Sequence, residues 1–262
     1  MPAFTWDVDP ILIHFPSWLS FLPVEGIRYY SLLYVGVFLG GYKLLDWQIR
    51  RAGGSEEDAN DFVVYGVIAV LAGARMGHVF FYEWDRFVKD PMWLFMIHKG
   101  GLASHGATIG LIVVMWLFTK LRRQSFIEGC DRFAFSAAVG STLGRIGNFF
   151  NAEMGGRMTD ADWGVRFPRY DGYSNPPLRH PSQLYEVFLG LVVMGILLWF
   201  DRFLGKEKRP RGALISMFFA TYFTGRFIVE YFKEFQTAME QHSIFTMGQW
   251  LSIIPAIAGY IG

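Results

Sequence analysis

Seven long apolar segments follow one another along the chain, separated by more polar stretches. They cover about residues 27–45, 62–82, 101–119, 133–150, 183–200, 212–232 and 244–261. Each reaches the length of roughly 17 to 25 residues that a helix needs to cross the hydrocarbon core of a bilayer. The pattern predicts an all-α polytopic membrane protein with about seven transmembrane helices in one integral membrane domain, residues 1–262.

Composition agrees with a membrane protein and narrows the class further. The 262 residues are 52% hydrophobic and only 18% charged, whereas soluble domains average about a quarter charged residues. Outside the loops between the spans the chain has no basic face, so no nucleic-acid partner is expected. The single cysteine, Cys130, cannot form an internal disulfide, and we expect it to be structural.

The basic residues of the connecting loops predict the orientation. One set of alternate loops is short and dense in charge, with Lys43, Arg50 and Arg51, then Lys120, Arg122 and Arg123, then Arg202, Lys206, Lys208, Arg209 and Arg211. The other set spreads its charge over longer loops, with Arg86, Lys89 and Lys99, then Arg157, Arg166, Arg169 and Arg179, then Lys233. Because cytoplasmic loops carry the excess of lysine and arginine, we expect the N-terminus outside and the C-terminus in the cytoplasm.

Two segments are expected to lie outside the bilayer on the outer side. Residues 1–26 lack the basic start of a signal peptide and are rich in aromatic residues, as in a segment at the level of the lipid headgroups. Residues 151–182 form a loop beyond the usual connection length. We predict that this loop builds a small extracytoplasmic head.

Ionisable side chains inside the predicted spans are candidates for function. They are Arg75, His78, His105, Arg145, Arg226 and Glu230. Each costs at least about 2.5–3.5 kcal/mol on insertion, so such residues face a bundle interior or a wet cavity. Arg226 and Glu230 lie one turn apart and could simply pair with each other. His78 is expected to be structural or secondary.

Helical spacing groups several of these residues. Arg145 and Asn148 share one helix face, and Tyr222, Arg226 and Glu230 share another. A guanidinium stays charged in a poorly hydrated site and matches phosphate oxygens bidentately. A phospholipid head group is therefore the simplest ligand, while an anion-transport site and internal ion pairs remain alternatives.

His105 is a candidate for proton transfer, since imidazole titrates near neutral pH. Glycines flank it in KGGLASHGATIG (99–110) and would leave the ring uncrowded, although a hydrogen-bonded structural role is the alternative. The sequence shows neither metal-ligand spacings nor a nucleophile elbow, P-loop or dinucleotide fingerprint. No metal and no cofactor are expected.

The run GRIGNFFNAEMGGR, Gly144 to Arg157, resembles the signature of the prolipoprotein diacylglyceryl transferase family. Further blocks of the family occur in its order over nearly the whole chain. They are RYYSLLY (28–34), GARMGHVFFY (73–82), KDPMWLF (89–95), KGGLASHG (99–106), RHPSQLYE (179–186), GRFIVEYF (225–232) and MGQWLS (247–252).

The resemblance implies an enzyme of the bacterial cytoplasmic (inner) membrane with seven spans. Such an enzyme transfers the sn-1,2-diacylglyceryl group of phosphatidylglycerol to the lipobox cysteine in the signal peptide of a prolipoprotein, forms a thioether and releases glycerol 1-phosphate. By matching positions, the essential residues would be His105, Arg145 and Arg226. The other important residues would be Tyr30, Asn148, Glu153, Gly156, Tyr222 and Glu230.

These assignments lead to a mechanism without a cofactor. His105 would take the proton of the substrate thiol, and Arg145 and Arg226 would bind the phosphate and stabilise its developing charge. Asn148, Asn151 and Tyr222 are candidate neutral donors to the head group. Glu153 and Glu230 would orient the arginines or have only a structural role.

The chain departs from the family pattern at two places. Ala107 stands where a second glycine usually follows His-Gly. Lys233, Glu234, Phe235 and Gln236 replace an arginine followed by Pro-Asp, which leaves the shape of the loop before the last span open. The alternative functions are an anionic lipid or organic anion transporter and a non-catalytic paralogue, which would be expected to lack His105 or one of the two arginines.

Overall fold

The computed structural model describes residues 4–19, 21, 24–97, 100–172, 175–235 and 243–262, and most of them are helical. It divides into two compact units. The first unit comprises Met1–Leu44 with Phe133–Gly262, and the second comprises Leu45–Arg132. The single integral membrane domain over residues 1–262 stays a prediction. Lys99 and Gln236, both named above, lie outside the described residues.

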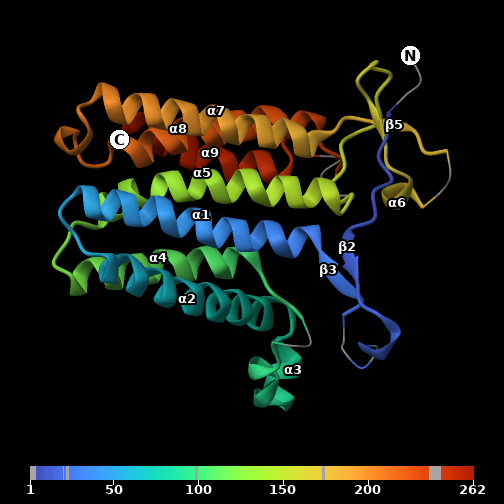
Figure 1. The fold of residues 1–262 in the computed structure, drawn as a ribbon, viewed down its shortest axis with the longest axis horizontal. Coiled ribbons are helices and arrows are strands. Elements are labelled where there is room, and N and C mark those ends of the chain that lie inside the picture. Colours follow the sequence, from blue (N-terminus) through green and yellow to red (C-terminus); the bar gives the residue numbers. More distant parts are fainter. Residues whose placement is uncertain (1–3, 20, 22–23, 98–99, 173–174, 236–242) are drawn as a thin grey trace. The chain divides into compact units, whose positions relative to one another are not determined.

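Each predicted span corresponds to one long helix. These helices are α1 (Tyr29–Arg51), α2 (Glu56–Tyr82), α4 (Ser104–Leu121), α5 (Phe126–Phe150), α7 (Ser182–Phe203), α8 (Ala213–Val229) and α9 (Met247–Ile261) (Figure 1). Four are long and apolar enough to cross a membrane: α2, α4, α7, and α8 extended by the 3-10 turn η5 (Glu230–Phe232). Helix α9 is apolar but shorter. The described part of the chain therefore has the helices of a multi-pass membrane protein.

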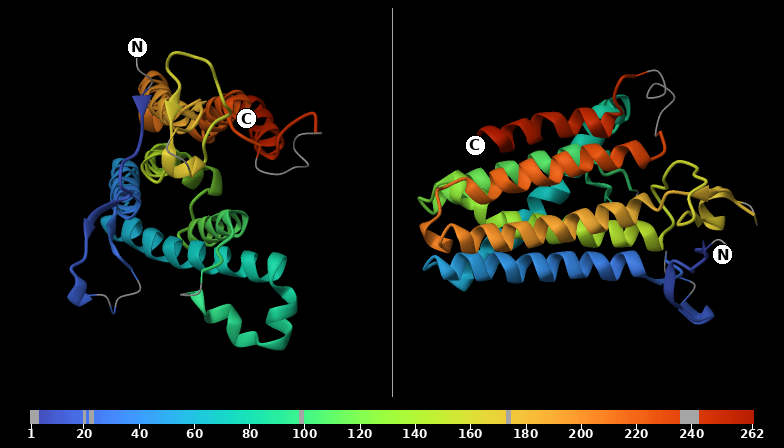
Figure 2. Two further views of the ribbon diagram at one scale, coloured as in Figure 1. Left: turned by 90° about the vertical axis from the view of Figure 1, so that its right-hand side faces the viewer. Right: turned by 90° about the horizontal axis from the view of Figure 1, so that it is seen from above.

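The core of the first unit lies between α5, α7 and α8. Ala134, Phe135 and Ala138 of α5 pack with Val193 and Leu197 of α7 and with Leu214 and Phe218 of α8. Helices α7 and α8 run side by side, and α9 packs along α8 (Figure 2). Small residues allow the close approach: a Cβ atom on Gly190 of α7 would lie 2.1 Å from the Thr142 hydroxyl of α5. Such contacts are typical of helix packing in membranes.

Short strands form outside the long helices of the first unit. Strands β1 (Phe4–Thr5), β4 (Val165–Arg166) and β5 (Leu178–Arg179) make a three-stranded sheet in the order β1-β4-β5. Strands β2 (Ile11–His14) and β3 (Gly26–Arg28) pair antiparallel, and short helical turns occupy η1 (Ser17–Leu19) and α6 (Pro168–Asp171). The Trp6 indole donates to the Phe149 carbonyl over 2.9 Å and ties the N-terminal segment to the end of α5. The structure is therefore not entirely helical outside the bundle.

In the second unit, glycines bring α2 and α4 together. The capping box of Ser55 and Asp58 begins α2. A Cβ atom on Gly73 would lie 2.4 Å from the Gly106 carbonyl oxygen, and one on Gly110 would lie 2.2 Å from that of Ala69. The backbones therefore touch along the two helices, as in small-xxx-small interfaces.

The buried Arg75 holds the connection between α2 and α4, which contains α3 (Trp84–Lys89) and η2 (Pro91–Phe95). Its guanidinium donates to the carbonyls of Leu94 (3.1 Å), Gly100 (2.7 Å) and Trp93. These carbonyls accept the hydrogen bonds of the buried guanidinium inside the second unit. His78 lies 3.4 Å from the carboxylate of Glu83, and its structural or secondary role stays a prediction.

Candidate functional site

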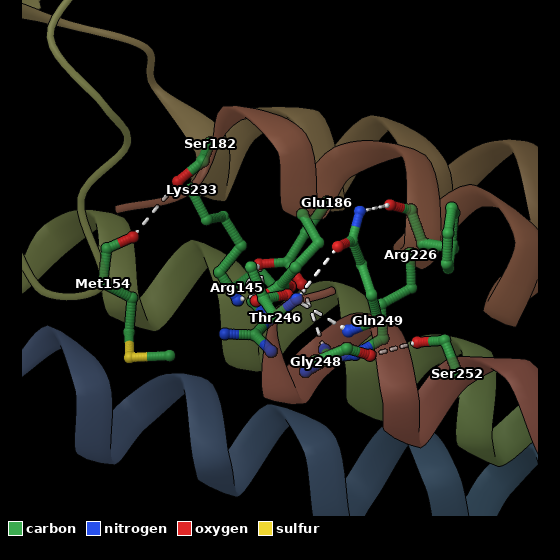
Figure 3. Close-up of polar contacts among 12 residues, drawn as sticks. Arg145, Met154, Ser182, Glu186, Arg226, Lys233, Thr246, Gly248, Gln249 and Ser252 are labelled. Atoms are coloured by element: carbon green, nitrogen blue, oxygen red, sulfur yellow. Dashed lines mark hydrogen bonds and ion pairs between the residues drawn. The ribbon is translucent and has the colours of Figure 1, made fainter. Parts of the chain in front are cut away.

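Two arginines from different helices meet at one buried carboxylate in the first unit. Glu186, in the second turn of α7, lies 3.1 Å from Arg145 Nε through Oε2 and 3.2 Å from Arg226 Nη1 through Oε1. Arg145 comes from α5 and Arg226 from α8, and Figure 3 shows both side chains converging on Glu186. The structure thus brings together two of the three predicted catalytic residues.

A second ion pair extends this group. Lys233, directly after η5, places Nζ 3.3 Å from Glu230 Oε2 and 3.9 Å from Glu186 Oε2. We call Arg145, Glu186, Arg226, Glu230 and Lys233 the ion cluster. Three cations and two carboxylates give this cluster a formal charge of +1.

The members of the ion cluster differ in exposure. The side chains of Glu186 and Lys233 are 3% and 2% exposed, whereas those of Arg145 and Arg226 are 17% and 21% exposed. An approaching molecule therefore meets guanidinium groups, with both carboxylates and the ammonium behind them. Partly desolvated guanidinium groups bind phosphate or carboxylate strongly.

Helix α9 closes the cluster from another side. Thr246 caps the start of α9 in a capping box with Gln249. Gly248, the second residue of α9, lies against Glu230. A Cβ atom on Gly248 would come within 2.4 Å of the Glu230 carboxyl carbon. The absence of a side chain at position 248 thus makes room for a buried carboxylate.

A polar chain leads from Arg145 toward the residues that follow α5. Arg145 Nη1 donates to Asn148 Oδ1 over 3.3 Å, and Asn148 Nδ2 donates to Glu153 over 3.4 Å. Asn151 Nδ2 also donates to Glu153, over 3.0 Å. Gln183 of α7 binds the Glu153 carbonyl. Arg145 and Asn148 therefore share a face as predicted, but Glu153 contacts Arg145 only through Asn148.

Three further predicted residues surround this part of the first unit. The Tyr30 ring lies against Gly147, where a Cβ atom would be 2.6 Å from it. The Tyr222 ring stacks on Phe218 in the core. Gly156 lies between two backbones, because its Cβ atom would be 2.2 Å from the His180 carbonyl and 2.7 Å from that of Phe232. Gly156 thereby joins the loop after α5 to the end of η5.

The ion pairs differ from the simplest expectation. Arg226 and Glu230 could have paired within one helix, but Arg226 pairs with Glu186 and Glu230 pairs with Lys233. Sequence reasoning missed Glu186, although an acidic residue inside the apolar segment 183–200 was a signal of the kind used for the other candidates. Lys233 was expected in a loop, and its burial depends on residues far away in the chain.

His105 belongs to the second unit. It is the second residue of α4, is exposed, and lies near the rings of Phe81 (5.1 Å) and Tyr82 (5.9 Å). The neighbouring Gly106 allows α4 to pack closely on α2. A joint site of His105 with the two arginines of the first unit stays a prediction.

The arginines of the outer loop have partners of their own. Arg179 is buried, with Nη2 2.6 Å from Asp171 Oδ1 and Nη1 3.1 Å from Glu234 Oε2. The hydrogen bonds to Asp171 raise the pKa of Arg179 above its usual value. Arg169 pairs with Asp7 at the surface, and Arg166 donates to Asn175 and to the Pro176 carbonyl. Arg179 is therefore part of the fold of this loop rather than of a solvated face.

An apolar pocket of about 520 Å³ lies between α7 and α8, the helices that carry Glu186 and Arg226. Its lining includes Phe188, Leu189 and Val192 from α7 and Gly225 and Ile228 from α8. The Trp163 indole, at one edge, donates to the Tyr185 hydroxyl over 2.9 Å. This lining suits hydrocarbon.

Comparison with known proteins identifies the family. A family model described as prolipoprotein diacylglyceryl transferase matches residues 16–262. Phosphatidylglycerol–prolipoprotein diacylglyceryl transferases from Idiomarina loihiensis and Pseudoalteromonas translucida are 36% and 38% identical to this chain, and each match covers 97% of the chain and 91% of the relative. One from Vibrio cholerae is 37% identical, with coverage of 97% and 90%. The chain therefore belongs to the prolipoprotein diacylglyceryl transferase family.

Proposed function

We propose that this chain transfers the sn-1,2-diacylglyceryl group from phosphatidylglycerol to the lipobox cysteine of a prolipoprotein, in the first step of lipoprotein maturation. The names of the relatives support this reaction. The observation that carries it in the structure is the convergence of Arg145 and Arg226 on Glu186 within long helices of an apolar bundle. Two partly exposed guanidinium groups at such a place suit an anionic lipid head group.

In this proposal the two arginines bind the phosphate of phosphatidylglycerol. Glu186 holds one nitrogen of each guanidinium, so the remaining N–H groups of each are oriented together. Asn148 already receives a hydrogen bond from Arg145 and can use its amide group toward the head group. The acyl chains remain in hydrocarbon, and the pocket between α7 and α8 offers apolar surface for them.

The reaction exchanges one bond to the glyceryl carbon for another. The substrate thiol loses its proton to a base, for which we propose His105, and the thiolate attacks the carbon that carries the phosphate ester. A carbon–sulfur bond forms as the carbon–oxygen bond breaks, and the electron pair leaves with glycerol 1-phosphate. The leaving phosphate gains negative charge, which Arg145 and Arg226 stabilise in a poorly hydrated site.

We further propose seven spans, α1, α2, α4, α5, α7, α8 with η5, and α9. The N-terminus would lie outside the bacterial inner membrane and the C-terminus in the cytoplasm. Residues 151–182, joined to the N-terminal segment by β1 and β4, would form the extracytoplasmic head where the signal peptide of the prolipoprotein arrives.

The test uses purified protein, a lipobox peptide and detergent-solubilised lipid. Phosphatidylglycerol should increase the peptide mass by one diacylglyceryl group, and phosphatidylethanolamine should leave it unchanged. Arg145→Ala should reduce transfer at least about 100-fold, in the range of losing a charge-stabilising donor. Arg169→Ala, which removes an exposed arginine paired with Asp7, is the matched control and should retain activity.

Three results would contradict the proposal. Equal transfer from both lipids would exclude the phosphatidylglycerol assignment, and normal turnover by folded Arg145→Ala would exclude the phosphate role. Movement of anionic lipid across vesicles without any change in the peptide would indicate a transporter instead.

A further inference from the structure

Lys233 is a buried ammonium that is not hydrogen-bonded to any residue in the described part of the chain. Its side chain is 2% exposed, and Nζ makes ion pairs with Glu230 and Glu186 without hydrogen-bond geometry. The Oε2 atoms of both glutamates likewise have ion pairs but no hydrogen bond. The ammonium is thus held at its place by charge and by the backbone around it.

The backbone of Lys233 is fixed from two sides. Its N–H donates to the Glu230 carbonyl, which closes the turn η5. Its carbonyl accepts from Arg157 Nε over 2.9 Å, and residue 233 forms an antiparallel bridge with Gly156. The ammonium is consequently directed into the cluster by the loop that follows α5.

The net charge of the ion cluster depends on Lys233. Arg145 and Arg226 balance Glu186 and Glu230, so the surplus of +1 depends on Lys233. A lipid phosphodiester carries one negative charge, and a phosphate monoester carries about 1.5 to 2 at pH 7. The reaction in the proposed function converts the first into the second, so the demand for positive charge grows as the phosphate leaves.

We propose that Lys233 is a positioning residue that supplies the net positive charge of the ion cluster and holds Glu186 and Glu230 in place for the two arginines. It acts through these neighbours and does not touch the substrate. The inference rests on the proposed function, because the phosphate is that of the lipid donor.

Charge-balanced variants test this role. Lys233→Met should lower kcat/KM for phosphatidylglycerol at least about tenfold, because the cluster becomes neutral. Lys233→Arg should retain most of the activity. The double variant Lys233→Met/Glu230→Gln restores the cluster charge of +1. It should recover at least half of the decrease in log(kcat/KM) caused by Lys233→Met. If Lys233 were needed only for packing, removing the charge of Glu230 as well would not restore activity.

This group of variants contains its own control for folding. Lys233→Met leaves Glu230 without its cation and can fail to fold, whereas the double variant and Lys233→Arg do not bury an unbalanced carboxylate at position 230. Wild-type kcat/KM in folded Lys233→Met would overturn the inference. So would a folded double variant with the activity of Lys233→Met or less, or a folded Lys233→Arg as inactive as Lys233→Met.

The pH dependence of activity is a second test of the role of Lys233. Burial lowers the pKa of Lys233 below its ordinary value, against the raising effect of Glu186 from α7 and Glu230 from η5, while Arg145 from α5 and Arg226 from α8 lower it further. The ammonium should lose its proton at a lower pH than an exposed lysine, whereas an arginine stays charged. Lys233→Arg should therefore extend activity to higher pH than the wild type, and identical alkaline limbs would contradict the role.

Inorganic phosphate as a ligand separates this inference from the proposed reaction. Phosphate should raise the thermal unfolding midpoint of the wild type and of the double variant but not of Lys233→Met. If these shifts occur while no peptide is modified, the reaction is wrong and the charge role stands. If the wild type modifies the peptide and Lys233→Met responds to phosphate equally, the charge role is wrong and the reaction stands.

Discussion

Glu186 explains why the two arginines depend on each other. Its carboxylate is almost fully buried and contacts both guanidinium groups. Breaking such a pair by removing one partner leaves an uncompensated charge, which typically costs about 3–5 kcal/mol. A substitution of Arg145 or Arg226 therefore acts on stability as well as on phosphate binding, and activity must be compared among folded variants.

The proposed role of His105 as the base can be tested with a single substitution. His105→Gln keeps a polar side chain at the exposed start of α4 but removes the titrating group. We expect transfer at neutral pH to fall about 100-fold or more, the range of general-base catalysis, and the remaining rate to rise with pH as the substrate thiol, of pKa about 8.5, ionises by itself. Rates measured from pH 6 to 9 check this, and a profile parallel to that of the wild type would leave His105 only a positioning role.

Glycine contacts determine how the elements pack. At Gly248 the missing side chain admits the Glu230 carboxylate, and at Gly73, Gly106 and Gly110 it admits the backbone of the neighbouring helix. Glycine thus makes room for a buried carboxylate in the first unit and for a neighbouring helix in the second. Van der Waals contact between backbones is an important source of helix association in lipid.

A pair of alanine variants in α2 tests the packing role. Gly73→Ala places Cβ 2.4 Å from the Gly106 carbonyl oxygen and should destabilise the protein by about 1–3 kcal/mol through overpacking. Gly66→Ala, on the same helix, meets nothing within 4 Å and should be neutral or stabilising by up to about 1 kcal/mol. Thermal unfolding in detergent measures both, and equal midpoints would exclude close α2–α4 packing as the reason for Gly73.

Single cysteines can test the predicted orientation of the protein in the membrane. Cys130 is the one native cysteine, so Cys130→Ser provides the background. Met158→Cys, exposed in the loop after α5, should react with a membrane-impermeant maleimide in intact spheroplasts. Gln124→Cys, exposed between α4 and α5, should react only after lysis. The reverse labelling would mean that the N-terminus lies in the cytoplasm.

Local sequence patterns were sufficient to predict a multi-pass helical membrane protein, its family and the positions of the long helices. The length of an apolar segment is a local property of the sequence. The run from Gly144 to Arg157 can likewise be recognised without knowing which residues it contacts. The spacing of Arg145 and Asn148 likewise predicted one shared face, because a single helix determines it.

The ion pairs, in contrast, depend on how distant segments of the chain pack together. Arg145, Glu186 and Arg226 belong to three helices, whereas spacing within one helix offered a pair of Arg226 with Glu230 only as an alternative. Lys233 is read from the sequence as a loop residue, yet the bridge to Gly156 and the contact with Arg157 place it in the ion cluster. A buried charge selects its partner by distance in space, since unpaired burial is so costly. Segments far apart in the chain determine that distance.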